Sequence, residues 1–198
     1  MSILSISGFG SAGASPNKQR LLQLLSLQLF SKSNREVFYF TPDYTETPSE
    51  TIELYDAVIQ DHHDIDLIVG TSMGGWLAQH LGNKYGIPFV AINPAINPQK
   101  TLQRRIGEGT NYDDTPYSLT EEVVNAYEPM GHGGCGLILV DMDDEVIDSQ
   151  ETISTFSSSF QVSSFPGGNH RFTHWEESVQ LIKSFYTNSE LQYGLDYT

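Results

Sequence analysis

One stretch of the chain decides the fold: Leu67-Ile68-Val69-Gly70-Thr71-Ser72-Met73-Gly74-Gly75-Trp76. Its apolar first part predicts a buried strand, and the residues after Ser72 predict the start of a helix. Glycines stand two positions before and two positions after Ser72. In a sharp strand-to-helix turn they let the two elements approach closely, and the turn lifts the serine hydroxyl out of the sheet. Ser72 is therefore the predicted nucleophile; the alternative is a glycine-rich turn whose serine has no chemical role.

Strands and helices alternate on both sides of this stretch. Short apolar runs predict strands at 3–7, 36–40, 66–69, 89–92, 137–140 and 160–165. Between them, amphipathic segments predict helices at 16–31, 49–60, 73–85, 149–158 and 174–188. Strands that alternate with helices form parallel sheets that are covered on both faces. The expected fold class is α/β, with about six mostly parallel strands flanked by helices.

Two helix ends carry their own sequence signals. Ser15 is a residue type that caps helix N-termini, and Pro16 has a backbone angle suited to the first helical position. Gly86 follows the helix at 73–85 and suits the backbone conformation that ends helices. These signals predict a start at Pro16 and an end at Gly86.

The alternation is interrupted once, by a long insertion at 94–134. It contains two expected short helices, at 99–106 and 119–126, which are separated by a loop at 107–117. A long insertion on the ligand-facing side of such a sheet usually serves function. We therefore expect one domain, residues 1–198, with a short helical lid formed by this insertion.

The charge of the chain argues against some classes of partner. Among 198 residues, acidic side chains outnumber basic ones 25 to 10, which gives a net charge of −15. Nucleic acids and anionic membranes are bound through clustered lysines and arginines, so neither is an expected partner. Solubility is the simplest role for the negative charge.

Cysteine content and hydropathy suggest a compartment. Cys135 is the single cysteine, so neither an intrachain disulfide nor a cysteine-based metal cluster is expected. The N-terminus lacks the pattern of a signal peptide, and no run approaches the ~18–20 apolar residues that span a bilayer. We expect a cytoplasmic protein without integral membrane association, and the oligomeric state stays open.

A nucleophilic serine needs an adjacent base, and six histidines are available. In enzymes with a serine on this kind of turn, the acid and then the histidine follow it in the chain. His170 lies in a glycine-rich loop directly after the last predicted strand and is the preferred base. His174, at the start of the closing helix, is the alternative. The other candidates, His132 in the lid and the pair His62-His63, come too early in the chain.

The acid is expected just after the predicted strand at 137–140. Three aspartates occupy this turn: Asp141, Asp143 and Asp144. Asp144 is preferred because Asp144-Glu145-Val146 resembles the Asp-x-Val sequence often found at this turn in enzymes whose serine lies on a strand-to-helix turn of this kind. Asp141 and Asp143 remain alternatives, and acidic residues in such a turn are also typical of a solvated surface.

Backbone N–H groups are the expected oxyanion donors. Met73 begins the helix after Ser72, so its N–H points toward the position where negative charge develops. A second donor is expected from the loop Ser7-Gly8-Phe9-Gly10-Ser11 after the first strand, with the N–H of Phe9 as the best candidate. The alternative is a phosphate-binding loop, although the segment lacks the complete pattern of one.

Taken together, these motifs resemble the YqiA-like esterases, a compact branch of the α/β hydrolases. The resemblance covers most of the chain and implies an α/β-hydrolase sheet without the first two strands of larger relatives. It also implies Ser72, Asp144 and His170 as a catalytic triad that needs no cofactor and no metal. The family usually has His-Gly-Phe at the first segment, where this chain has serine. The segments that carry the resemblance are Ser7-Gly8-Phe9, Gly70-Thr71-Ser72-Met73-Gly74-Gly75, Asn93-Pro94-Ala95, Asp144-Glu145-Val146-Ile147-Asp148 and Gly167-Gly168-Asn169-His170-Arg171-Phe172.

The predicted function is that of a serine esterase that hydrolyses small or medium acyl carboxylesters through an acyl-enzyme, with a small-molecule ester as partner. One alternative is an acyl-CoA thioesterase, whose anionic leaving group would suit the basic lid residues Lys100, Arg104 and Arg105. The competing interpretation of these three residues is a solvated helix face. The other alternative is a catalytically silent hydrolase-fold binding protein. In that case segment 190–198 is a candidate contact surface, and the competing interpretation of this segment is a frayed end. The lid residues that line an acyl pocket, or pack between lid and body, are Leu102, Ile106, Tyr112, Tyr117, Leu119 and Tyr127.

Overall fold

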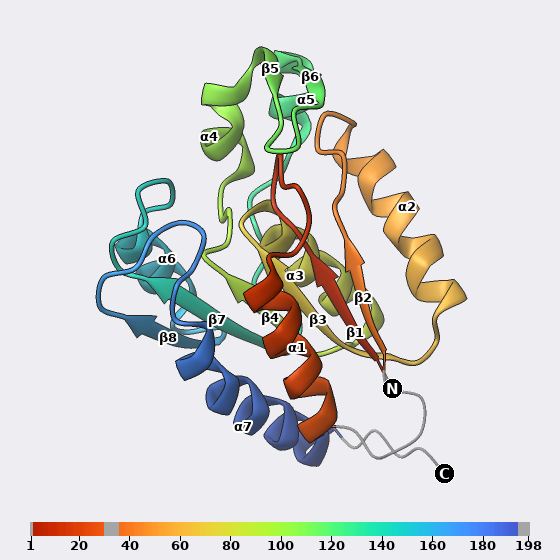
Figure 1. Cartoon of the computed structure of the whole chain (residues 1–198), viewed down its shortest axis with the longest axis vertical. Coiled ribbons are helices and arrows are strands. Elements are labelled where there is room, and N and C mark those ends of the chain that lie inside the picture. The colour runs from red at the N-terminus through yellow and green to blue at the C-terminus, as the bar shows by residue number, and fades with distance from the viewer. Residues whose placement is uncertain (1, 30–35, 194–198) are drawn as a thin grey trace.

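The computed structural model describes residues 2–29 and 36–193 (Figure 1). The six strands predicted from the sequence are confirmed, each within two residues of its expected bounds. They are β1 (Ser2–Ile6), β2 (Glu36–Phe40), β3 (Ile65–Thr71), β4 (Phe89–Ile92), β7 (Gly136–Asp141) and β8 (Gln161–Phe165). The helices between them are α1 (Pro16–Leu29), α2 (Pro48–Asp61), α3 (Met73–Tyr85), α6 (Ser149–Phe156) and α7 (Trp175–Tyr193).

The five long helices are also confirmed, with small differences at their ends. The predicted end of the first helix, residues 30–31, and the last part of segment 190–198, residues 194–198, lie outside the described residues. Ser15 Oγ accepts a hydrogen bond from the Lys18 N–H at 3.2 Å, which caps α1 as predicted. Gly86 ends α3 at φ 69°, in the left-handed region that favours glycine.

The six strands form one parallel sheet in the order β2-β1-β3-β4-β7-β8. The chain moves from β1 outward to β2, returns to the other side of β1 at β3, and then continues to β8. The direction of winding therefore reverses between β1 and β3. In open parallel sheets, ligands bind outside the carboxyl ends of the strands at such a reversal.

Side chains along each strand alternate between the two faces of the sheet, so that each face presents an apolar layer. Helices cover both of these layers. Figure 1 shows α1 and α7 side by side against one face, and these two helices contact each other. The opposite face packs against α2, α3 and α6. The α1 and α7 layer includes Ile3, Leu22, Leu25, Leu67, Val90, Ile182 and Tyr186. The other layer includes Leu4, Tyr55, Ile68, Leu77, Leu81, Ala91 and Phe156.

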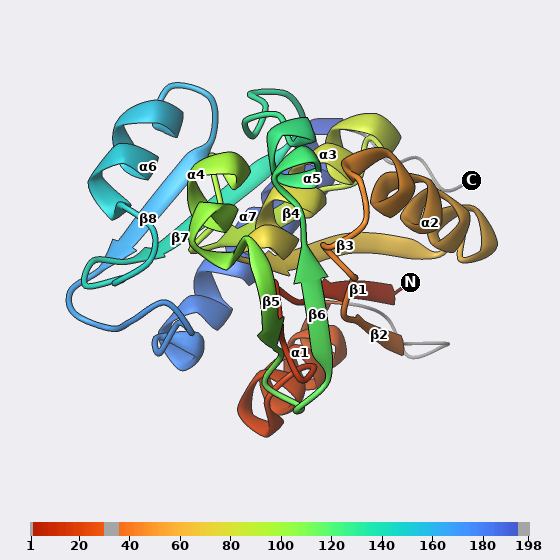
Figure 2. The same cartoon turned by 90° about the horizontal axis from the view of Figure 1, so that it is seen from above.

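The insertion at 94–134 lies over the carboxyl ends of the strands (Figures 1 and 2). It contains α4 (Pro98–Leu102), the 3₁₀ turn η1 (Gln103–Arg105) and α5 (Glu121–Ala126), so the two predicted helical segments are confirmed. The predicted loop at 107–117 is wrong, because this segment forms an antiparallel hairpin of β5 (Gly107–Thr110) and β6 (Pro116–Leu119).

The hairpin escaped prediction because its strands contain glycines, which have little intrinsic preference for strands. Gly109 pairs directly with Tyr117, and a Cβ at Gly109 would lie 2.5 Å from the Tyr117 ring. The Tyr117 ring in turn packs edge-on against Phe9, with ring centroids 5.0 Å apart. A contact between lid and body therefore stabilises a strand pair that its own sequence does not indicate.

The tip of the hairpin is attached to the loop that follows β1. The N–H of Tyr112 donates to the carbonyl of Gly10 at 2.9 Å, and the N–H of Asn111 donates to Thr115 within the tip. At the base of the insertion, the N–H of Met130 donates to the carbonyl of Ile96. The insertion is thus closed at its base and bound at its tip, directly above β1 and β3.

Candidate active site

Ser72 occupies a strained turn between β3 and α3. Its backbone has φ 55° and ψ −120°, values that a residue with a side chain rarely adopts. The glycines around it allow this turn, because a Cβ at Gly70 would lie 1.9 Å from the carbonyl oxygen of Gly74. A Cβ at Gly74 would lie 2.4 Å from the carbonyl oxygen of Ile6 in β1. Strand, helix and neighbouring strand therefore meet at a distance that only glycine permits.

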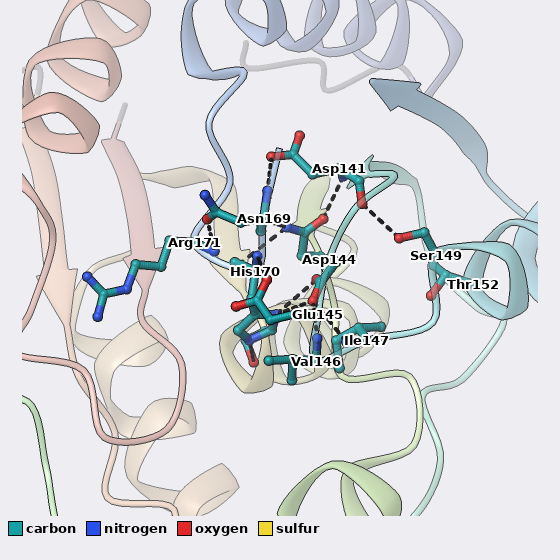
Figure 3. A network of polar contacts seen from close by, with 12 residues as sticks. Asp141, Asp144, Glu145, Val146, Ile147, Ser149, Thr152, Asn169, His170 and Arg171 are labelled. Atoms are coloured by element: carbon teal, nitrogen blue, oxygen red, sulfur yellow. Dashed lines mark hydrogen bonds and ion pairs between the residues drawn. The ribbon is translucent and has the colours of Figure 1, made fainter. Parts of the chain in front are cut away.

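The Ser72 hydroxyl lies beside the imidazole of His170. Ser72 Oγ and His170 Nε2 are 3.0 Å apart, although the two residues are 98 positions apart in the chain. The other ring nitrogen, Nδ1, lies 2.9 Å from Oδ2 and 3.0 Å from Oδ1 of Asp144 (Figure 3). An Nδ1 that donates to the carboxylate leaves Nε2 as an acceptor for the serine proton.

Asp144 is enclosed and firmly held. Its side chain is 1% exposed, and Oδ1 accepts hydrogen bonds from the N–H groups of Val146 at 2.7 Å and Ile147 at 2.9 Å. Two backbone donors and the contact with the imidazole fix the orientation of this side chain. The carboxylate therefore orients His170 through a short, rigid turn that directly follows β7.

The loop that carries His170 is anchored by Asp141, the last residue of β7. Asp141 Oδ2 accepts hydrogen bonds from the N–H groups of Asn169 at 3.1 Å and Thr173 at 2.8 Å. Gly168, at φ 81°, lies so close that a Cβ there would be 2.0 Å from this oxygen. On the outer side, the N–H of His170 itself donates to Glu145 Oε2 at 3.0 Å, and this hydrogen bond lowers the pKa of Glu145.

Asp141 also forms a second carboxylate–imidazole pair, with His174. Oδ1 of Asp141 lies 2.7 Å from Nδ1 of His174, whose ring stacks against Phe165. The two alternative candidates from the sequence are thus paired with each other and not with Ser72. The third candidate acid, Asp143, is exposed, and its N–H donates to the carbonyl of Gly167.

Histidines elsewhere lie in other surroundings. His132 Nδ1 is 2.9 Å from Ser159 Oγ, and its ring packs against Phe156. His62 packs against Phe38 on β2, near the opposite ends of the strands. Among the six histidines, the structure brings His170 to the serine hydroxyl.

The two predicted oxyanion donors lie next to Ser72. A Cβ at Gly8, two residues after β1, would lie 2.9 Å from the Ser72 Cβ, and the next residue, Phe9, lines the same cavity as Ser72. Met73 is the first residue of α3, where an N–H has no acceptor within the helix. The reversal of the sheet between β1 and β3 brings these two segments together.

A cavity of about 500 Å³ opens above Ser72. Ser72, His170, Phe9 and Met73 all line it, as do Leu102 and Tyr112 from the lid. Of the other lid residues expected at an acyl pocket, Ile106 is exposed and the rest pack between lid and body. Leu119 and Tyr127 are buried in the core, and Tyr117 contacts Phe9. A cavity of this volume lies within the range of small-molecule sites.

Sequence reasoning missed two cations of the cavity. Lys18 from α1 and Arg171 from the histidine loop both line it. Arg171 directly follows the predicted base His170, and this position could have indicated it. Lys18 lies on a helix far from Ser72 in the sequence and belongs to no motif. Lys100, expected with Arg104 and Arg105, is instead paired with Glu151 at 2.7 Å.

Two absences concern residues 2–29 and 36–193, the part of the chain that the structure describes. No group of three or more His, Cys, Asp or Glu side chains in this part of the chain is arranged to hold a metal ion. None of the helices described is both long and apolar enough to cross a membrane.

Fold and site together define a protein with the α/β-hydrolase fold. Solved structures that match it include Est1E from Butyrivibrio proteoclasticus, with a TM-score of 0.67 at 15% identity over 95% of this chain and 87% of that one. They also include a monoacylglycerol lipase from Paleococcus ferrophilus, with a TM-score of 0.66 at 16% identity over 95% of this chain and 94% of that one. These likenesses show the fold.

Residues 2–187 match the family described as Uncharacterised protein family (UPF0227), and the chain belongs to this family. A relative in Vibrio cholerae is 26% identical over 184 residues, which cover 92% of this chain and 98% of the relative. A relative in Yersinia pseudotuberculosis is 27% identical over 186 residues, which cover 93% of this chain and 98% of the relative.

Proposed function

We propose that this protein is a serine hydrolase that cleaves small or medium acyl carboxylesters through an acyl-enzyme. The observation that carries the proposal is the line of contacts from Ser72 Oγ through both nitrogens of His170 to Asp144. The resemblance of the sequence motifs to the YqiA-like esterases points to the same chemistry. Est1E and the protein named monoacylglycerol lipase share the fold.

Acylation begins when His170 Nε2 accepts the proton of Ser72 as Oγ bonds to the ester carbonyl carbon. The carbonyl oxygen becomes an oxyanion, to which the N–H groups of Phe9 and Met73 donate. The carbon–oxygen bond to the alcohol then breaks, and His170 gives its proton to the leaving alkoxide. Asp144 stabilises the imidazolium and keeps Nδ1 protonated throughout.

Deacylation repeats these steps with water as the nucleophile. His170 accepts one proton of the water while its oxygen bonds to the acyl carbon. The bond to Ser72 Oγ breaks, the serine recovers its proton from His170, and the carboxylic acid leaves. The first proton transfer of acylation and the last of deacylation cross the 3.0 Å contact between Ser72 Oγ and His170 Nε2.

The test is labelling with a fluorophosphonate, which bonds to activated serines, followed by mass spectrometry to locate the adduct. We expect an adduct on Ser72 that is absent from Ser72→Ala and retained in Ser154→Ala, a control on the exposed side of α6. An unlabelled but folded wild-type protein would contradict the proposal and favour a catalytically silent binding protein. Relative rates on matched esters and thioesters then separate an esterase from an acyl-CoA thioesterase.

A further inference from the structure

The cavity above Ser72 has a charge opposite to that of the rest of the chain. The protein carries a net charge of −15 and contains 10 Lys and Arg residues. Four of these ten line the cavity, against one acidic residue, Glu145. The four are Lys18, Arg104, Arg105 and Arg171. Clefts lined by one sign of charge concentrate ligands of the opposite sign.

Lys18 is the most informative of the four, because it is a buried cation at the inner wall of the cavity. The residue is 5% exposed, and its Nζ lies 3.5 Å from Oγ1 of Thr71, the residue directly before Ser72. The Trp175 ring lies 5.8 Å away. Among the side chains that the structure describes, no carboxylate lies within 4.0 Å of this ammonium group.

A buried ammonium group without a counterion lowers the stability of the folded protein. Burial lowers the pKa of Lys18 to about 8, so the group remains mostly charged near pH 7. Its position in the first turn of α1 adds to this cost, since the helix dipole disfavours cations at an N-terminus. The fold therefore gains nothing from this charge, whereas an anionic ligand in the cavity would supply the missing partner.

The arginines are held over aromatic rings at the outer side of the same cavity. The Arg171 guanidinium lies 4.8 Å from the Tyr112 ring centroid, and that of Arg105 lies 5.9 Å from the Phe9 ring centroid. Hydrogen bonding to Arg171 and Arg105 lowers the pKa of the Tyr112 hydroxyl. In Figure 3, Arg171 extends away from the polar network around Asp144. Its donors are thus not engaged by the carboxylates of that network.

We propose that the substrate of this site is an ester that carries a carboxylate or phosphate group, which Lys18 and the three cavity arginines bind while Ser72 attacks the ester carbonyl. The inference rests on the proposed function and adds the substrate class to it. Arginine and lysine form charge-assisted hydrogen bonds with both kinds of anion. A site for neutral lipid esters would not require four cations, one of them buried.

The experiment compares kcat/KM for charged and neutral esters of matched size. The mono-4-nitrophenyl ester of adipate is paired with 4-nitrophenyl hexanoate, which places the charge on the acyl group. The hexanoate esters of 3-hydroxybenzoate and of 3-hydroxyphenyl phosphate are paired with that of 3-hydroxybenzamide, which places the charge on the leaving group. Spontaneous hydrolysis is measured without protein and subtracted. We expect at least one charged ester to exceed its neutral partner about tenfold or more.

Lys18→Met tests the residue that carries the inference, because methionine matches the length of lysine without its charge. We expect the ratio of charged to neutral kcat/KM to fall about tenfold, and less in Arg105→Gln and Arg171→Gln. The matched control is Lys84→Met. Lys84 lies in the last turn of α3, at the opposite end of this helix from Ser72, and is paired with Asp56 of α2. This variant should leave the ratio unchanged. Thermal unfolding shows that each variant is folded.

The pH dependence gives an independent measure of the same group. Lys18 is charged below its pKa of about 8 and neutral above it, so the preference of wild type for the charged ester should decline as pH rises through 8. The three arginines stay charged and preserve part of the preference. In Lys18→Met this decline should be absent. The other titratable groups that share the cavity are Tyr112, Glu145 and His170.

The outcomes separate the two proposals. If neutral esters are hydrolysed as fast as charged ones and Lys18→Met leaves the ratio unchanged, the substrate class is wrong while the esterase stands. If Ser72 resists fluorophosphonate and no ester is cleaved, the proposed function itself fails. If Ser72 is labelled but none of these esters is cleaved, the esters are compared by how far each one protects Ser72 from the fluorophosphonate. Equal protection by charged and neutral esters would then overturn the inference.

Discussion

Two carboxylate–imidazole pairs lie a few residues apart at the carboxyl end of β7, and only one of them reaches a serine. Asp144 pairs with His170, and Asp141 pairs with His174. Their burial is nearly the same, since the histidine side chains are 20% and 22% exposed and the aspartates 1% and 0%. Neither burial nor the pair itself therefore distinguishes a catalytic centre from a structural contact.

The difference lies in what surrounds each pair. The second nitrogen of His170 faces Ser72 at 3.0 Å and lines the cavity, whereas the ring of His174 stacks on Phe165. Asp144 orients one ring through its own turn, whereas Asp141 binds the backbone at Asn169 and Thr173. One pair is positioned to move a proton, and the other holds the loop on which the first pair depends.

The largest effect should come from replacing each of the two histidines in turn. His170→Gln removes the base and should lower kcat by about 10⁶-fold on 4-nitrophenyl hexanoate. His174→Gln, the matched variant, keeps a polar side chain beside Asp141 and should stay within about tenfold of wild type. Steady-state kinetics of the two variants measures this difference. Comparable losses in both would show that the two pairs cannot be separated by role.

The next effect concerns the acid. Asp144→Asn preserves the shape of the side chain but removes the charge that stabilises the imidazolium, so kcat should fall about 10⁴-fold. The thermal midpoint should change little, because the side-chain oxygen still accepts from Val146 and Ile147. Kinetics and thermal unfolding of the same preparation test both statements. Near-normal turnover would remove Asp144 from the mechanism.

A smaller effect is expected at Asp141, which acts on His170 only through the loop. In Asp141→Asn the buried site loses its charge, and the free energy of unfolding should fall by about 1–3 kcal/mol. We expect kcat to fall about tenfold with KM nearly unchanged, because the ring of His170 is less well positioned. Asp143→Asn, an exposed neighbour, serves as the control. A loss of kcat as large as that of Asp144→Asn would argue that Asp141 is the acid.

The smallest effect is expected at Glu145, which is exposed and accepts the N–H of His170. Its pKa is lowered in the folded protein, so its stabilising contribution is present above the ordinary pKa of glutamate and is lost as pH falls through the folded value. Glu145→Gln should therefore lower the thermal midpoint slightly at pH 7. The difference from wild type should shrink as the pH falls below the ordinary pKa of glutamate, and a difference that stays constant would contradict the assignment.

Much of the candidate site could be read from local sequence, and the reasons are physical. The glycines around Ser72 are needed by backbone contacts at that turn, so their spacing is itself a signal. The order of Ser72, Asp144 and His170 follows from the order of parallel strands, whose carboxyl ends meet at one edge. The β5–β6 hairpin could not be read, because Gly109 owes its strand conformation to the ring of Tyr117.

The sequence by itself determined the alternation of strands and helices, the turn at Ser72 and a short list of acids and bases. These depend on periodic burial and on backbone freedom, which are properties of neighbouring residues. Only the tertiary structure decided which aspartate pairs with which histidine, and that Lys18 of α1 lies beside Thr71. Such contacts join residues tens of positions apart, and their geometry is fixed by how the sheet and its helices pack rather than by any local pattern.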